Sequence, residues 1–132
     1  MKQPTDWDEL PNFQSSEFDS PDLPNSGENM QREFMQMLQA ARTIAGVPFK
    51  ISSGYRTQAH HDSLTRRGYP TAKRSAHLKG QAADILVSNS VQRAQIVSAL
   101  MQAGFHRLGL ADRFIHCDND EENKPAPCIW LY

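Results

Sequence analysis

Two short segments of the sequence combine histidine and aspartate in a pattern that could bind a metal ion. Residues 75–84 read SAHLKGQAAD, with His77 in a predicted loop and Asp84 inside an otherwise apolar strand. Residues 114–118 read FIHCD and place His116 on a second strand. Two neutral imidazoles and one carboxylate, with a fourth position left for water, are typical of catalytic zinc sites. These residue types therefore suggest a three-ligand zinc site.

Each of these residues also has an ordinary structural explanation. A single histidine on a strand is more often a hydrogen-bonded polar residue than a metal ligand. An unpaired buried carboxylate is costly, so Asp84 predicts a positive group nearby, and Arg56 or Arg113 could supply it. Strand alternation turns Cys117 away from His116 and toward the core. The spacing alone leaves a metal site and a set of structural polar residues as alternatives.

The hydropathy pattern predicts the elements that must position these residues. Helices are expected over residues 28–45, 58–66 and 90–103, and strands over 49–53, 81–87, 105–110, 113–117 and 128–132. Because the strands on either side of residues 111–112 would form an antiparallel hairpin, this order indicates an α+β fold. We expect an antiparallel or mixed sheet with helices packed on one face.

The N-terminal segment differs in composition from the rest of the chain. Residues 1–27 are rich in Pro, Asp, Ser and Asn and show no sustained periodicity, so we expect an extended arm with turns. Spaced apolar side chains should pin this arm to the surface of a single domain formed by residues 28–132; they are Trp7, Leu10, Phe13 and Phe18.

Composition excludes several functional classes. The 132 residues suit one domain, and 14 Lys+Arg against 15 Asp+Glu give no basic excess of the kind that nucleic-acid binders carry. No apolar run is long enough to span a membrane, and the N-terminus has no apolar stretch of a secretory signal peptide. The only cysteines, Cys117 and Cys128, are too few for a disulfide scaffold, and whether they pair is left open.

Three motifs, in order, resemble those of the D-alanyl-D-alanine zinc peptidases. Residues 75–84 fit that family's signature S-x-H-x-x-G-x-A-x-D, and residues 114–118 are similar to its second metal motif. Residues 53–56, SGYR, resemble its arginine motif. The chain looks most like the short single-domain members found in phages and prophages. The resemblance implies the hedgehog/DD-peptidase fold.

The resemblance also assigns roles to residues. His77, Asp84 and His116 would hold one zinc ion. Arg56 would bind the carboxylate of the substrate or stabilise the developing oxyanion, which suits a planar guanidinium. Ser75 would support a ligand or contact the substrate backbone.

The general base is less clearly assigned, because the position three residues before the last histidine, often acidic in the family, is Arg113 here. We favour Asp112 as the base. Asp118 is the other candidate, or it could orient a ligand imidazole. Tyr55, inside the arginine motif, is grouped with Ser75 and Asp118 as a residue that supports a ligand or touches the substrate.

The function implied is hydrolysis of an amide bond in peptidoglycan stem peptides by a zinc-activated water. Both a D,D-carboxypeptidase and an endopeptidase are compatible with the motifs. The alternative is a non-catalytic, zinc-containing module of the same fold that binds the cell wall. The protein is expected to be a monomer that is made in the cytoplasm and reaches the wall after lysis, as an endolysin does, or as part of a phage or exported assembly.

Overall fold

The described part of the chain folds into three α-helices, four short 3-10 helices and one sheet. A computed structural model describes residues 3–122 and 124–132. Its α-helices are α1 (Arg32–Ala45), α2 (Gln58–Arg66) and α3 (Ser90–Gln102). Its strands are β1 (Ile51–Ser53), β2 (Ala82–Leu86), β3 (Arg107–Leu110), β4 (Phe114–Asp118) and β5 (Cys128–Leu131). The 3-10 helices are η1 (Trp7–Glu9), η2 (Ser15–Phe18), η3 (Ser26–Asn29) and η4 (Ala76–Lys79).

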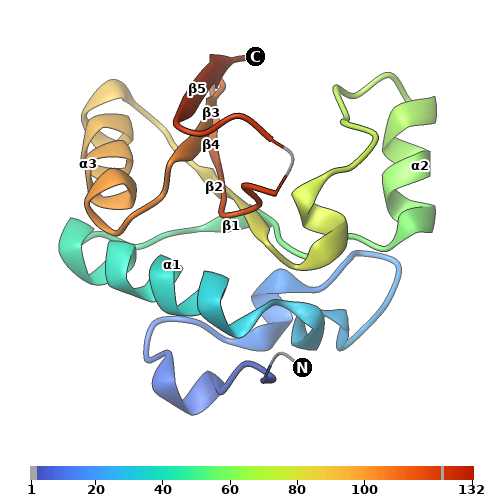
Figure 1. The fold of residues 1–132 in the computed structure, drawn as a ribbon, viewed down its shortest axis with the longest axis horizontal. Coiled ribbons are helices and arrows are strands. Elements are labelled where there is room, and N and C mark those ends of the chain that lie inside the picture. The colour runs from blue at the N-terminus through green and yellow to red at the C-terminus, as the bar shows by residue number, and fades with distance from the viewer. Residues whose placement is uncertain (1–2, 123) are drawn as a thin grey trace.

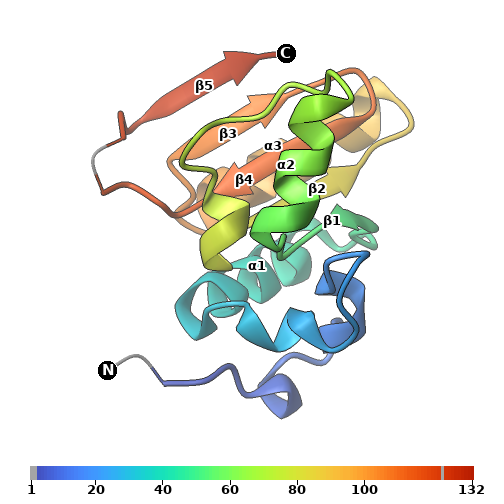
Figure 2. The same ribbon diagram turned by 90° about the vertical axis from the view of Figure 1, so that its right-hand side faces the viewer.

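The five strands form one mixed sheet in the order β1-β2-β4-β3-β5. All neighbouring pairs are antiparallel except β3 and β5, which run parallel. Helices α1 and α3 pack together on one side of the sheet, and α2 lies in front of the opposite face (Figures 1 and 2). The predicted α+β class and mixed sheet are confirmed, with α2 standing apart from the two helices that share a face.

The strand register lines up five residues across one face of the sheet. Ser53 pairs with Asp84, Asp84 with His116, His116 with Gly109, and Gly109 with Trp130. Because side chains of paired residues point to the same face, this row places Asp84 and His116 side by side, with the Arg107–Asp118 pair two positions along the same face. The opposite face carries the apolar side chains.

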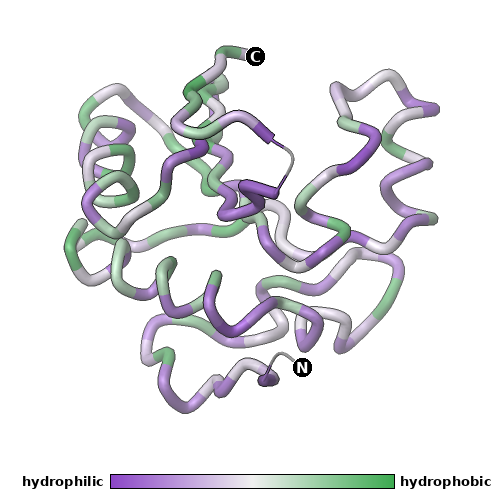
Figure 3. The backbone as a smooth tube through the Cα atoms, viewed as in Figure 1, coloured by the Kyte–Doolittle hydropathy of each residue, from purple (hydrophilic) through white to green (hydrophobic). Residues whose placement is uncertain are grey.

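The core lies between that apolar face and the helices. On the three central strands, Ile85, Ile115 and Leu108 are each one position away from the polar row and are buried, and they pack with Leu38 of α1 and Leu100 of α3. The strict alternation predicted for residues 81–87 and 114–118 is therefore confirmed. By contrast, α2 and the loop that follows it are largely hydrophilic (Figure 3), as expected for a rim element outside the core.

The N-terminal segment is wound into η1, η2 and η3 rather than extended. The expectation of pinning side chains is met, because Leu10, Phe13 and Phe18 are buried in the core. Trp7 packs against Phe18 at a ring distance of 5.8 Å. Short turns of this kind let several apolar side chains from a Pro- and Asp-rich stretch reach one surface. In an extended arm, successive side chains would point to opposite sides.

The predicted helix boundaries hold best where capping residues define them. Thr57 caps α2 by accepting a hydrogen bond from the backbone N–H of His60, and Gly46 ends α1 with a φ of 67°. The first helix starts at Arg32 rather than 28, because Met30 is extended and the backbone N–H of Gln31 donates to the carbonyl oxygen of Gly80. This bond ties the start of α1 to the segment that carries His77.

Both cysteines are free thiols. Cys117 lies on the core face of β4, where burial raises the pKa of its thiol, while Cys128 begins β5. Strand β3 lies between these two strands, so the neighbouring arrangement that a disulfide would need does not occur.

Among the described residues, no helix has the length and apolar character needed to cross a membrane.

Candidate metal centre

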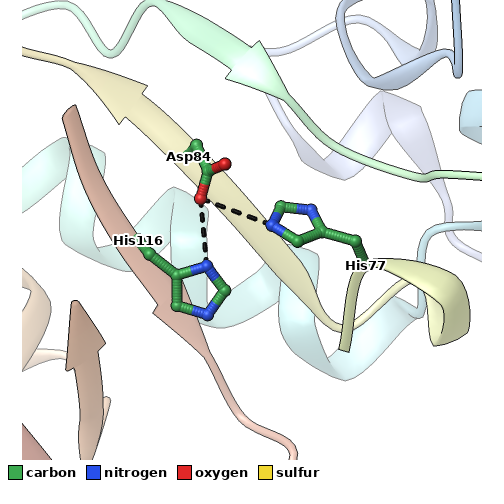
Figure 4. A group of neighbouring side chains, drawn as sticks. All are labelled: His77, Asp84 and His116. Carbon is green, nitrogen blue, oxygen red and sulfur yellow. Dashed lines mark hydrogen bonds and ion pairs between the residues drawn. The ribbon is translucent and has the colours of Figure 1, made fainter. Parts of the chain in front are cut away.

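Three buried side chains from three elements converge on one point, as Figure 4 shows. Asp84 of β2 and His116 of β4 are cross-strand partners, and His77 comes from η4, which packs beside β2. The Oδ1 atom of Asp84 lies 3.3 Å from Nε2 of His77 and 3.0 Å from Nδ1 of His116. One donor atom from each residue falls within 4.8 Å of the others. The structure therefore brings together the three residues predicted as zinc ligands.

The hydrogen bonds of the two imidazoles leave the converging nitrogens available to a metal. Nδ1 of His77 lies 2.7 Å from the carbonyl oxygen of Gly54, which can only accept, so this nitrogen carries the proton. Nε2 of His116 lies 2.7 Å from Oδ2 of Asp118. Metal-binding histidines commonly donate their second N–H to such an acceptor, which fixes the ring and the tautomer. The donor set and its surroundings fit a zinc ion.

The electrostatics of the group reflect its burial and close packing. Burial opposes ionisation of Asp84, but the two histidines outweigh it and hold its pKa well below the usual range. Burial lowers the pKa of His77. Burial also disfavours a charged His116, yet its hydrogen bonds to Asp118 and Asp84 prevail and raise its pKa to about 9. Without metal, a proton on Nδ1 of His116 thus occupies the direction in which a metal would bind.

The raised pKa of His116 predicts how the metal-free protein responds to pH. Since the folded protein holds this proton more tightly than the unfolded chain, whose histidines titrate near 6.5, the stabilisation is complete below about pH 6.5. It should be lost as pH rises through about 9, at a cost of about 3 kcal/mol in the free energy of unfolding. His77 acts in the opposite sense and only below about pH 6.5, because its pKa is lowered.

Chemical denaturation of the metal-free protein at pH 6.5, 8 and 9.5 checks this expectation. The zinc-loaded protein should lack the decline, because the metal replaces the proton on Nδ1. His116→Ala, which removes the titrating group, should lack it too. A metal-free wild type that is equally stable at pH 6.5 and 9.5 would show that His116 does not hold the extra proton.

A cleft opens over the three residues. Its walls come from the loop after α2, at Pro70–Ala72, from Trp130 of β5, and from Tyr132, which follows β5. Arg56, which follows β1, also lines it. The Arg56 guanidinium donates to Ser53 Oγ at 3.1 Å and to Asp84 Oδ2 at 3.4 Å, so it is fixed beside the candidate metal position. This placement agrees with the predicted contact between Arg56 and a substrate carboxylate or oxyanion.

The two other residues of these motifs have supporting positions. Ser75 is buried and caps η4, with its Oγ accepting a hydrogen bond from the backbone N–H of His77 at 3.2 Å. It therefore acts on the ligand-bearing turn rather than on an imidazole. Tyr55 packs against the core, and the described lining of the cleft does not include it.

The structure does not bring Asp112 to the site. This residue is exposed in the turn between β3 and β4, and its carbonyl oxygen accepts a hydrogen bond from Arg93 of α3. Asp112 is not among the described residues that line the cleft over the candidate ligands. The structure therefore does not support its predicted role as the general base.

Asp118 lies in the cleft, with both carboxylate oxygens engaged. Oδ2 faces His116, and Oδ1 accepts from Nε of Arg107 at 2.8 Å and from the backbone N–H of Asp120 at 3.1 Å. Burial would raise the pKa of Asp118, but the bonds from His116 and Arg107 lower it. Of its two predicted roles, the structure favours orientation of an imidazole.

Sequence reasoning missed Arg107 and Trp130. The guanidinium of Arg107 lies 5.0 Å from the Trp130 ring, and that ring lies 5.4 Å from the ring of His116. Both line the cleft. A signal was available, because a hairpin between the predicted strands at 105–110 and 113–117, taken with strand alternation, puts Arg107 on the same face as His116.

Gly109 makes room for the aromatic wall of the cleft. A Cβ atom at this position would lie 2.6 Å from Nε1 of Trp130 and 2.8 Å from Cε2 of Tyr132. The missing side chain lets the Trp130 ring settle beside His116, the cross-strand neighbour of Gly109, and leaves room for the Tyr132 ring in the cleft wall. Gly109→Ala should therefore push both rings away from the site.

We expect Gly109→Ala to lower the free energy of unfolding by about 1–3 kcal/mol, the usual cost of overpacking. Chemical denaturation measures this loss, and the same substitution in a Trp130→Ala background should cost less, because one clash is gone. An equal loss in both backgrounds would show that the indole does not fill the space above Gly109.

Comparisons with known proteins agree with this site. The model of the peptidase M15 family matches residues 11–118. The crystal structure of the Serratia marcescens L-Ala D-Glu endopeptidase ChiX matches with a TM-score of 0.51 and 27% sequence identity. That match covers 57% of this chain and 62% of the ChiX chain, so it spans less than two thirds of either. No curated protein sequence matches the chain significantly.

The mixed sheet carries a buried group of two histidines and one aspartate, and this group opens to a cleft. Such an arrangement suits a zinc metallopeptidase. The chain belongs to the peptidase M15 family, since the family model covers well over half of its length. The resemblance seen in the three sequence motifs is confirmed.

Proposed function

We propose that this protein is a zinc-dependent peptidase that cleaves an amide bond in the stem peptides of peptidoglycan. The observation that carries the proposal is the convergence of His77, Asp84 and His116 at the base of a cleft, with Arg56 fixed beside them. The ChiX match supports a peptidoglycan peptide as substrate. One zinc ion held by these residues would supply Lewis-acid polarisation of the scissile carbonyl and a water of lowered pKa.

The other residues of the cleft would bind and orient the substrate. Arg56 presents a planar guanidinium to a carboxylate or to the oxyanion that develops at the scissile carbonyl. The described cleft contains three cations, Arg56, Arg107 and Lys124, against the two carboxylates Asp84 and Asp118. This balance suits an anionic peptide, and the rings of Trp130 and Tyr132 would exclude water along one wall.

A second function is favoured by one observation. Among the described residues that line the cleft, the only carboxylates are Asp84, a ligand candidate, and Asp118, whose two oxygens are engaged. A site that lacks an unengaged base could bind the metal and the wall peptide without turnover. The second candidate is therefore the non-catalytic zinc-containing module.

Digestion of purified peptidoglycan fragments, with products identified by mass spectrometry, separates these functions. The zinc-loaded protein, the chelator-treated protein and the His116→Ala variant would be compared. Zinc-dependent loss of one alanine identifies a D,D-carboxypeptidase, and cleavage of the stem or of cross-linked dimers identifies an endopeptidase. No product from protein that holds one zinc supports the binding module, and no product without zinc contradicts the metal site.

The route to the substrate belongs to the same proposal. The protein would meet the cell wall after release by lysis or as part of a phage or exported assembly, and it would act there as a monomer. Fractionation of infected or lysing cultures, followed by detection of the protein on isolated walls, would test this route.

A further inference from the structure

Arg107 is a buried cation that makes none of the described contacts with the three candidate ligands. It begins β3 opposite Asp118 of β4, and only 9% of its surface is exposed. Its Nε donates to Oδ1 of Asp118 at 2.8 Å, and one terminal nitrogen donates to the carbonyl oxygen of Pro125 at 2.6 Å. A buried guanidinium that makes two short hydrogen bonds through different nitrogens is fixed in one orientation.

Asp118 connects Arg107 to the candidate metal site, because its two carboxylate oxygens bond to Arg107 and to His116. Oδ2 of the same carboxylate is 2.7 Å from Nε2 of His116. Asp118 is almost fully buried, with 2% of its surface exposed, and Arg107 is the permanently charged side chain that pairs with it. Without that partner, Oδ1 of Asp118 would keep only the backbone N–H of Asp120 as a described hydrogen-bond donor, and the carboxylate would be held less firmly.

The orientation of His116 depends on this carboxylate. An imidazole ring can turn over about its Cβ–Cγ bond, and it has two neutral tautomers, but only one combination directs an unprotonated Nδ1 toward Asp84 and His77. A carboxylate that accepts from Nε2–H selects that combination. The Trp130 ring, 5.0 Å from the guanidinium and 5.4 Å from the imidazole, restrains both groups on the other side.

We infer that Arg107 is a positioning residue of the metal centre, which holds Asp118 so that His116 presents Nδ1 to the metal. The inference rests on the proposed function, because it takes zinc as the occupant of the site. Through Pro125, Arg107 also joins the loop between β4 and β5 to the centre. That loop is anchored a second time by Asp120, which binds Lys79 of the ligand-bearing η4.

Zinc affinity, measured by competition with a chromophoric chelator, tests the inference without relying on catalysis. Arg107→Met should bind zinc about 10–100-fold more weakly than the wild type, the usual effect of losing a partner that orients a ligand. Arg107→Lys keeps the charge beside Asp118 and should recover part of the affinity. Arg113→Met, on an exposed arginine at the start of β4, should bind zinc like the wild type.

A proton NMR signal separates positioning from a general structural role. In the zinc-loaded wild type, the Nε2–H of His116 should give a downfield resonance that exchanges slowly with water. Arg107→Met should lose that protection, while Arg107→Lys should keep it in part. Folded variants that bind zinc as tightly as the wild type and keep the resonance would overturn the inference. A wild type that binds no zinc would instead overturn the proposed function.

Discussion

Replacing His116 by alanine is expected to abolish zinc binding and peptidase activity together. His116 supplies one of three converging donor atoms, and its Nδ1 lies 3.0 Å from Oδ1 of Asp84. Two remaining ligands cannot form the three-residue site that catalytic zinc requires. Because the metal contributes several kcal/mol to transition-state stabilisation, kcat/KM should fall by more than about 1,000-fold.

The measurement pairs zinc content per chain with the rate of release of peptidoglycan fragments. His106→Ala is the matched control, since this histidine is exposed just before β3 and its side chain pairs with Glu121, away from the cleft. The control should keep one zinc and its activity. A His116→Ala protein that retains both would mean that the metal and the chemistry lie elsewhere.

Replacing Arg56 by methionine should reduce activity without loss of zinc. The guanidinium touches the candidate ligand Asp84 but offers no metal-binding atom; it lines the cleft, and 13% of the Arg56 side chain is exposed. Loss of one fixed donor to a developing oxyanion usually lowers kcat by about 100–1,000-fold. If Arg56 instead binds a carboxylate that is present in the ground state, KM should rise and kcat should change less.

Steady-state kinetics on a defined stem peptide distinguish these two roles of Arg56. Arg56→Lys should restore only part of the activity, because an ammonium lacks the planar pair of donors. Arg66→Met, on the exposed side of α2, controls for loss of charge. A normal rate in Arg56→Met with normal zinc content would remove Arg56 from substrate binding and from catalysis.

The sequence allowed the ligand group to be predicted because local rules determine its placement. Alternation along residues 82–86 and 114–118 puts Asp84 and His116 on the face opposite Ile85 and Ile115. Gly80, with a φ of 70°, lets the chain turn from η4 into β2, so His77 comes back over the sheet. A Cβ at Gly80 would also meet the backbone of Asn29, which makes glycine necessary there.

The contacts of Arg107 and the start of α1 could not be predicted in this way, because they depend on strand register and on contacts between segments far apart in the sequence. The guanidinium of Arg107 stands beside Asp118 only because β3 and β4 adopt one particular register. The start of α1 is set by a backbone bond to Gly80, almost fifty residues away. Asp112 was predicted as the base because the usual acidic position in the family is Arg113 here. The structure instead leaves Asp112 exposed in the turn, where its carbonyl oxygen accepts from Arg93.

The most direct test of the account is a crystal structure of the zinc-loaded protein with anomalous data collected at the zinc edge. We expect one strong peak per chain, with Nε2 of His77, Oδ1 of Asp84 and Nδ1 of His116 as its protein ligands. The distance from the zinc to each of these atoms should be about 2.0–2.2 Å. No sulfur should be bound, since Cys117 lies on the core face of β4. A peak held by other residues, or no peak at this group, would contradict the zinc site on which the proposed function depends.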